Sequence, residues 1–166
     1  MVARHPDHHA ILITHAYAYS DGTRYDRKTK AASETWNPNA YGVGTWTQEK
    51  KHGVNDGESL WQKLVARHKQ FAFTFNGHVR NDGIGHVESQ GVHGNNVHQM
   101  LANYQCGVVP NCKNGGGGFL RLVQVQPDGV TVNISDYSPF YDQWLTNADR
   151  NFTIKLERNL NQVMPV

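Results

Sequence analysis

The chain has 166 residues, of which 38% are hydrophobic and 16 are glycines. This length predicts one domain over residues 1–166, and the glycine content favours a mixed α/β or strand-rich fold over a helix bundle. A formal net charge of +2 is too small to indicate nucleic-acid binding, and no apolar stretch approaches the roughly 20 residues of a membrane span. The opening residues, MVARHPDHH, are polar, so we expect no signal peptide in this chain, and the compartment stays undetermined.

The first half of the chain follows the order strand, loop, helix, strand. Residues 10–19 contain contiguous apolar positions at 11–13, which predict a strand covered on both faces. A polar loop rich in aromatic residues covers 20–56, and loops of that length are commonly functional. Residues 70–78 alternate phenylalanine with smaller residues and predict a second strand. This order is a βαβ unit, so the two strands are expected to lie parallel.

Residues 55–69 predict the helix of this unit. Asn55 or Asp56 can cap its first turn, and Glu58 is placed to complete a capping box with Asn55. Apolar residues recur at helical spacing, and Trp61 among them is expected in the core.

The second half of the chain is dominated by predicted strands. These cover residues 83–91, 96–105, 118–126, 130–138 and 151–157. Residues 96–105 also fit one face of a helix, so both assignments stay open. Asp128-Gly129 predicts a tight hairpin turn, and the four glycines at 115–118 predict a flexible joint or an insertion point. Cys106 and Cys112 are expected as either thiols or one local disulfide, because their spacing is unusual for a zinc site.

Histidine is the unusual feature of the composition, with ten residues. His15 follows the first predicted strand, and His78 follows the second directly after Gly77. Neighbouring parallel strands lie about 5 Å apart and end at one edge of a sheet, so these imidazoles could share a metal ion or a substrate group. The alternative is a hydrogen-bonded pair of structural histidines. Gly77 is expected to let the backbone turn sharply at this corner and a ligand approach it.

A catalytic metal site requires more than two imidazoles. Hydrolytic metals are usually held by three or more protein ligands, carboxylates included, with one open position. The carboxylates Asp21, Asp26, Asp82 and Glu88 are candidates, but none has a convincing spacing to His15 and His78.

Five segments resemble, in order, the C-terminal half of the calcineurin-like metallophosphoesterases. They are THAY (14–17), WNPNAYG (36–42), NDGESLW (55–61), GHVRNDG (77–83) and GNNVHQMLANYQ (94–105). The resemblance implies part of a four-layer αββα sandwich, mainly of strands with one clear helix. It also implies hydrolysis of a phosphate ester by two divalent metal ions, with manganese, iron and zinc not distinguished.

The resemblance implies that His15 and His78 bind the same one of the two metals. Arg80 stands where many relatives have a second histidine, and it is expected either in solvent or against substrate phosphate. Asn76 is expected to bond a phosphate or to orient His78. Tyr17 is expected either to line a substrate pocket or to pack the loop onto the sheet.

The motifs G-D-x-x-D and G-N-H-[DE] of the family's N-terminal half do not occur in this sequence. We therefore expect the chain to supply the C-terminal half of an enzyme, with little hydrolysis alone, and the missing half or a partner chain to complete it. The leading edge of its sheet should then be exposed, which favours self-association. The alternative is a non-catalytic module that binds a ligand or a partner on a relic phosphoesterase fold.

Overall fold

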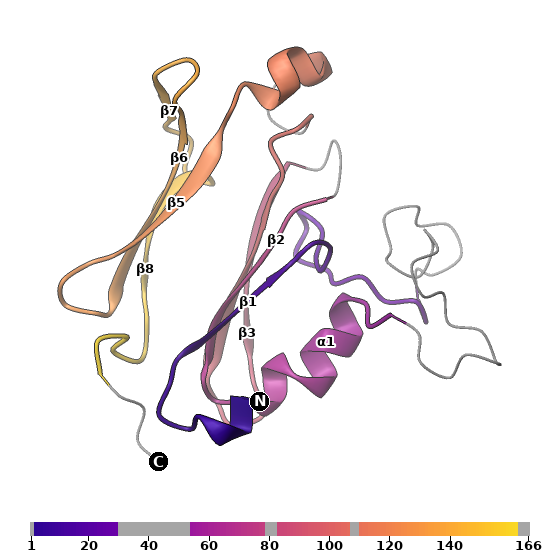
Figure 1. The fold of residues 1–166 in the computed structure, drawn as a ribbon, viewed down its shortest axis with the longest axis vertical. Coiled ribbons are helices and arrows are strands. Elements are labelled where there is room, and N and C mark those ends of the chain that lie inside the picture. Colours follow the sequence, from indigo (N-terminus) through magenta and orange to yellow (C-terminus); the bar gives the residue numbers. More distant parts are fainter. Residues whose placement is uncertain (1, 30–53, 79–82, 107–109, 163–166) are drawn as a thin grey trace.

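The computed structural model describes residues 2–29, 54–78, 83–106 and 110–162. In these residues the fold is mixed α/β, with most of the regular structure in two four-stranded sheets and a single α-helix, α1. Figure 1 shows the second sheet packed on one side of the first sheet and α1 on the other side. The helix, first sheet and second sheet thus form successive layers.

The first sheet carries the predicted βαβ unit. Its strands are β1 (Ala10–Thr14), β2 (Phe71–Asn76), β3 (Ile84–Gln90) and β4 (Asn96–Ala102), in the spatial order β1-β2-β4-β3. β1 and β2 are parallel, as predicted, β2 and β4 are also parallel, and β3 is antiparallel to β4. The ambiguity over residues 96–105 is resolved as a strand.

The prediction that the first strand is covered on both faces was wrong. β1 is an edge strand, and the side chains of Ile11 and Ile13 are 55% and 80% exposed. Leu12, between them, packs against the core beneath α1. Within this apolar run, Leu12 therefore faces the core on the helix side, whereas Ile11 and Ile13 are exposed on the other side of the sheet.

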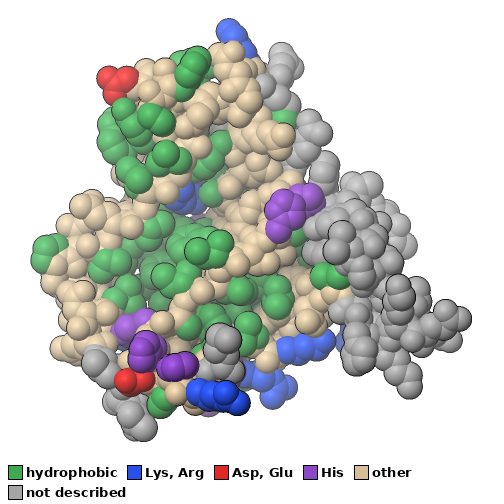
Figure 2. Space-filling view, in the orientation of Figure 1, with side chains coloured by type: hydrophobic (Ala, Val, Ile, Leu, Met, Phe, Trp, Pro, Cys, Tyr) green, Lys and Arg blue, Asp and Glu red, His purple; other side chains and the backbone are tan. Residues whose placement is uncertain are grey.

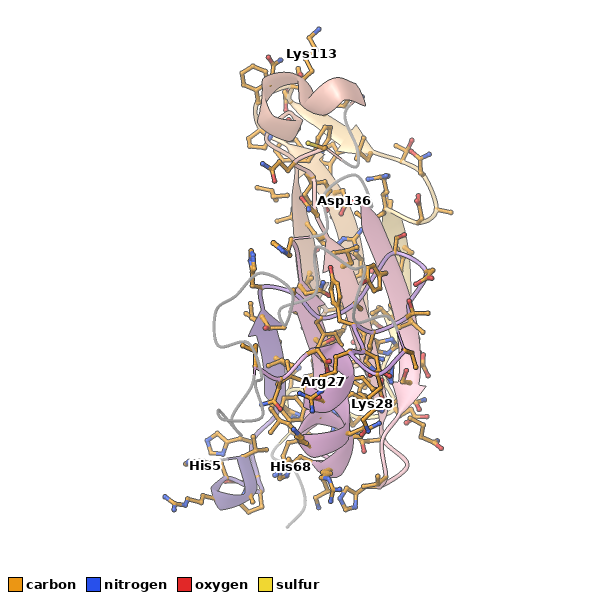
Figure 3. All side chains as sticks on the ribbon, turned by 90° about the vertical axis from the view of Figure 1, so that its right-hand side faces the viewer. His5, Arg27, Lys28, His68, Lys113 and Asp136 are labelled. Atoms are coloured by element: carbon orange, nitrogen blue, oxygen red, sulfur yellow. The ribbon has the colours of Figure 1, made fainter. Side chains whose placement is uncertain are left out.

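The second sheet is antiparallel throughout. It contains β5 (Leu120–Val125), β6 (Thr131–Ser138), β7 (Gln143–Leu145) and β8 (Asn151–Lys155). β7 was not predicted, because its three residues are too few to show an alternating pattern. In the side view the strands of both sheets run along the long axis of the molecule, and Asp136 lies among the strands of the second sheet (Figure 3).

The helix α1 (Gly57–Lys63) is shorter than the predicted 55–69, and a 3-10 turn at Val65–Arg67 follows it. Its N-cap is Asp56, whose carboxylate accepts a hydrogen bond from the Ser59 backbone amide at 2.9 Å. The capping box predicted between Asn55 and Glu58 was therefore wrong. Glu58 instead pairs with Arg24 at 3.1 Å, and that guanidinium stacks on the buried ring of Trp61.

Two hydrophobic clusters hold the layers together. Trp61 and Val65 pack with Phe71 between the helix layer and the first sheet. Phe73 and Met100 pack with residues of β6 and β8 between the two sheets. Phe71 and Phe73 are two positions apart on β2 yet belong to different clusters, because the pairing of β1 with β2 shifts register between Ala10 and Ile11.

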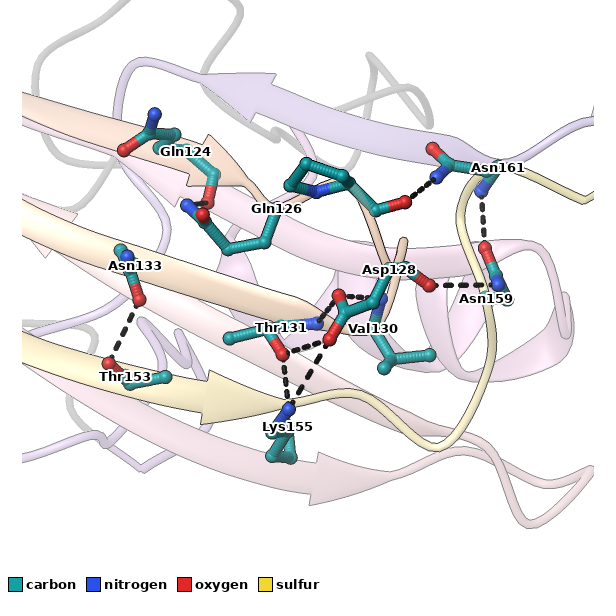
Figure 4. Close-up of polar contacts among 11 residues, drawn as sticks. Gln124, Gln126, Asp128, Val130, Thr131, Asn133, Thr153, Lys155, Asn159 and Asn161 are labelled. Atoms are coloured by element: carbon teal, nitrogen blue, oxygen red, sulfur yellow. Dashed lines mark hydrogen bonds and ion pairs between the residues drawn. The ribbon is translucent and has the colours of Figure 1, made fainter.

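The predicted hairpin turn at Asp128-Gly129 is confirmed between β5 and β6 (Figure 4). The Asp128 carboxylate accepts hydrogen bonds from the amides of Val130 and Thr131, at 3.0 and 2.8 Å. Gly129 adopts a left-handed φ of 71°, a conformation that glycine takes without strain.

The glycine-rich segment 115–118, predicted as a flexible joint or an insertion point, has a positive φ at all four of its glycines. It continues a 3-10 helix at Pro110–Gly116, and a Cβ atom on Gly116 would lie 2.1 Å from the Tyr104 carbonyl oxygen. Cys106 is disulfide-bonded, so the open question of its redox state is answered in favour of a bridge. A further 3-10 turn lies at Val2–Arg4, and none of the described helices is long and apolar enough to span a membrane.

Candidate metal-binding site

His15 and His78 lie side by side at the carboxyl edge of two adjacent strands. Thr14 pairs with Asn76 at the ends of β1 and β2, so the residues that follow leave the sheet together. The Gly77 amide donates a hydrogen bond to the His15 carbonyl oxygen at 3.2 Å. The two imidazole rings have centroids 4.1 Å apart and planes inclined by 49°. The convergence expected from the βαβ order is therefore present.

The corner depends on an unusual backbone conformation of His78. This residue has a φ of 71°, in the left-handed region that non-glycine residues seldom occupy. We had expected Gly77 to supply this freedom, but Gly77 has no positive φ, and a Cβ atom there would make only an ordinary contact at 3.6 Å. His78, the candidate metal ligand, therefore adopts the strained backbone conformation itself, and such strain is typical of functional positions.

The surroundings of His78 favour its neutral form. Partial burial is the main cause that lowers the pKa of His78, and the neighbouring His15 lowers it further. A neutral imidazole is the form that binds a metal ion, so a lowered pKa reduces the competition from protons.

The residues that the structure describes bring no further metal ligand to this pair. Within the described ranges, no three His, Cys, Asp or Glu side chains are grouped so that they could hold a metal ion. Asp21 and Asp26 accept hydrogen bonds within their own turns, from Thr23 and from the Lys28 amide. Glu88 lies 3.6 Å from His98 on β4, and Asp82 falls outside the described residues. The described residues thus contribute two imidazoles to the site.

The three expected substrate contacts have different outcomes. Asn76 is 5% exposed, and its amide nitrogen donates to the carbonyl oxygens of Ala18 and Gly77, at 3.0 and 3.2 Å. It therefore braces the corner that precedes His78. Tyr17 is fully buried and its hydroxyl donates to Gln99 at 2.9 Å, which gives it a packing role. Arg80 lies outside the described residues.

The sequence analysis missed a buried charge cluster on the second sheet. Arg121 of β5 donates two hydrogen bonds to Asp136 of β6, at 2.8 and 3.1 Å. Arg150 approaches the same carboxylate at 3.9 Å, and Asp136 is fully buried. The available signal was Arg121 itself, a charged residue at an inward position of an alternating strand.

Comparison with known proteins assigns no family. No family model matches the chain, and no solved structure matches it. A curated protein of Bacillus subtilis strain 168, described as uncharacterized protein YvnB, is 29% identical over 140 residues. The similarity covers 84% of this chain but only 8% of the length of that protein. The metallophosphoesterase resemblance therefore stays a hypothesis.

Proposed function

We propose that this chain supplies part of the metal centre of a metal-dependent phosphoesterase, with His15 and His78 as ligands of one divalent ion. The remaining donors come from outside the described residues, either from another segment or from a partner chain. In this proposal the two sheets and α1 are part of a four-layer sandwich, and a phosphate ester is the substrate. Imidazole ligands suit zinc and iron, whereas manganese would depend more on oxygen donors from outside this pair.

The observation that carries the proposal is the 4.1 Å separation of the two ring centroids. Metal–nitrogen bonds to histidine are about 2.0–2.1 Å long, so only rings that lie close together, as these two do, can share one ion. The pairing of β1 with β2 brings the two segments together, and both of them end in an imidazole at this edge. The left-handed His78 adds a strained backbone at the same point.

The chain's own residues have a positioning role in this site. The parallel pairing of β1 and β2 sets the separation of the two imidazoles, and Asn76 fixes the turn between β2 and His78. When bound, a dinuclear centre supplies Lewis acidity toward the phosphate and lowers the pKa of bound water.

The test is metal binding by the isolated chain. Zinc or manganese is titrated by calorimetry, and the histidine ring signals are followed by nuclear magnetic resonance. We expect weak binding that perturbs the rings of His15 and His78 first, and His78→Ala to abolish this component. His93→Ala is the matched control, because His93 is exposed and bonds only to the Arg67 carbonyl oxygen among the described residues.

Loss of the same component in His93→Ala, or its survival in His78→Ala, would contradict the proposal. The absence of a third metal donor in the described residues favours one alternative, a non-catalytic binding module. Such a module need not respond to metal, so an unchanged His78→Ala titration would support it.

A further inference from the structure

The outer face of the second sheet, turned away from the first sheet, carries side chains without charge. Alternate residues of β6 and β8 pack inward, and the residues between them point outward. The strand pairings place the outward residues of β5 to β8 in three successive rows, which we call the outer platform. Its rows are Leu120, Tyr137 and Trp144; Leu122, Ser135 and Asn151; and Gln124, Asn133 and Thr153. The next row begins the charged surface, with Lys155 beside Thr131.

The first row of the platform exposes aromatic and apolar side chains. Trp144 is 51% exposed, and Leu120 is 40% exposed. The rings of Tyr137 and Trp144 have centroids 4.5 Å apart and planes inclined by 37°. Figure 2 shows hydrophobic side chains gathered at the end of the molecule that carries β7 in Figure 1. An exposed group of apolar and aromatic side chains commonly marks a binding surface.

The aromatic pair is held in place by the turn between β6 and β7. The Tyr137 hydroxyl donates a hydrogen bond to Asp142 at 2.7 Å, and Asp142 has a left-handed φ of 50°. In the same turn, the Tyr141 amide donates to the Ser138 hydroxyl oxygen at 3.1 Å. A ligand that stacks on the platform therefore loses little binding energy to the ordering of these side chains.

The other two rows add hydroxyl and amide groups beside the rings. Gln124, Asn151 and Thr153 are exposed, and the Thr153 hydroxyl donates to Asn133 Oδ1 at 2.9 Å (Figure 4). Amide side chains both donate and accept hydrogen bonds, and so do hydroxyl groups. The platform thus combines ring faces with neutral groups of both hydrogen-bonding kinds.

This composition excludes several classes of partner. A nucleic acid requires Lys or Arg for its phosphates, and the three rows contain neither. A lipid bilayer or a packed layer of helices would bury the amide and hydroxyl groups without enough hydrogen-bond partners. Any helical layer of a complete four-layer sandwich is therefore expected beyond these rows. A neutral sugar matches the platform, because its C–H face is apolar and its hydroxyl groups donate and accept.

We propose that the outer platform binds a neutral polysaccharide of flat pyranose rings, of the kind found in a β-linked glucan. Sugar rings stack on Trp144 and Tyr137, and sugar hydroxyl groups bond with Asn151, Gln124 and the side chains beside them. The equatorial hydroxyl groups of such rings leave both faces free for stacking. The platform lies on the sheet face turned away from the first sheet, so this site does not depend on the proposed metal centre.

The test is calorimetric titration of the chain with cellohexaose and with maltohexaose. The two sugars have the same composition, but the α-linked chain of maltohexaose curls and presents no flat ribbon. We expect cellohexaose to bind about tenfold more tightly, and Trp144→Ala to weaken its binding by a similar factor because a stacking surface is lost. Asn151→Ala should weaken it about threefold through a lost hydrogen bond. Val92→Ala is the control, because Val92 is 71% exposed in the turn between β3 and β4, and it should bind like wild type.

Absence of cellohexaose binding, or equal affinity for the two sugars, would overturn the proposal. Unchanged affinity in a natively folded Trp144→Ala would also overturn it, and Asn151→Ala keeps the test decisive if Trp144→Ala fails to fold. Self-association in sedimentation that Trp144→Ala removes and cellohexaose does not displace would overturn it in favour of a second copy. Both variants should leave the zinc titration of His15 and His78 unchanged, so failure of this proposal is distinguished from failure of the proposed function.

Discussion

His78 combines a candidate chemical role with a strained backbone. A left-handed conformation costs an L-residue about 1–2 kcal/mol, since its Cβ atom crowds the following carbonyl oxygen. Its φ of 71° is one of three positive values among described non-glycine residues, and the other two are Asn114 and Asp142. Asparagine and aspartate adopt this region more readily than most residues, so the conformation of His78 has the highest expected strain of the three.

We predict that His78→Gly is more stable than His78→Ala by about 1 kcal/mol, because glycine adopts a positive φ without a Cβ penalty. Both variants lose the imidazole, so their difference isolates the backbone cost. The measurement is urea denaturation of the two variants. Gly77→Ala is the control, since Gly77 has no positive φ and an added Cβ would fit at 3.6 Å. Equal stability of the two variants at position 78 would show that the positive φ of this residue has no measurable cost.

For single residues, the sequence predicted that His15 and His78 lie close together, but it did not predict which residue at this corner adopts the left-handed backbone conformation. Strand order and parallel pairing are enough to bring His15 and His78 together, because the pairing of β1 with β2 leaves little choice of edge. The assignment of the turn to Gly77 failed, since glycine permits a positive φ without requiring one. Arg121 was overlooked, although the predicted Asp128-Gly129 turn already places it opposite Asp136 on β6.

The hairpin between β5 and β6 shows how one turn joins two elements. Gly129 lies at the turn, where a Cβ atom would approach Asn159 Oδ1 to 1.9 Å. Asn159 also donates to the Asp128 carbonyl oxygen at 2.9 Å, so the segment after β8 is tied to the turn (Figure 4). The turn therefore anchors the segment that follows the last strand.

We predict that Gly129→Ala destabilises the chain by more than Gly94→Ala. Both glycines have positive φ, 71° and 80°, so each substitution carries a strain of about 1–2 kcal/mol. A Cβ atom on Gly94 would meet nothing within 4 Å, whereas one on Gly129 would collide with Asn159. Thermal unfolding of the two variants measures the difference, which reports the contact with Asn159. Equal losses of stability in the two variants would mean that the segment containing Asn159 moves away from the added methyl group at no cost in free energy.

A second histidine pair lies where the two sheets meet. His86 of β3 and His98 of β4 are 3.2 Å apart between ring nitrogens, and the His86 ring stacks on Phe152 of β8. Burial lowers the pKa of His98, although Glu88 and Glu157 act in the opposite direction. The pKa of His86, whose side chain stays partly exposed, is also lowered by partial desolvation and by His98 and Arg121, while Glu88 acts in the opposite direction. Folding thus favours two neutral rings.

We predict that acid weakens the packing of the sheets through this pair. Histidine in an unfolded chain has a pKa of about 6.5, so below that pH the unfolded state binds more protons than the folded state. The stabilisation is complete above that pH and is lost as the pH falls through the lowered folded pKa values. Urea denaturation across this window should show a smaller loss in His98→Gln than in wild type, and His93→Gln serves as the exposed control. A profile unchanged in His98→Gln would exclude the pair as the cause.

Element types were more predictable than their surroundings. Alternating side chains identified β2, β5 and β6, and the Asp128-Gly129 turn set the pairing of the last two. The exposure of β1 was not predictable, because an apolar run looks the same in a central strand and at an edge. Of the two predicted caps, Asn55 and Asp56, the structure selects Asp56, since both residue types are good caps and tertiary contacts decide between them.

In the whole molecule, the helix covers one face of the first sheet, whereas the edge strands β1 and β5 leave one side of the two sheets uncovered by other described strands. A groove on this side is lined by residues of both strands, among them Ile13 and Val123. The histidine pair lies at the end of β1, next to this uncovered side. Under the proposed function, this is the side on which the remaining metal donors would be added.

We predict that the isolated chain, supplied with manganese, hydrolyses p-nitrophenyl phosphate no faster than manganese alone. Two imidazoles leave an ion mostly hydrated, and enzymes of this kind depend on a preorganised centre to reach accelerations of about 10⁶-fold or more. The His15→Ala/His78→Ala double variant is the control, because any rate that survives in it comes from a contaminant. Hydrolysis that exceeds the manganese rate and disappears in the double variant would show that this chain already holds a complete centre. That result would contradict the division of the site between two parts while leaving the two histidines as its ligands.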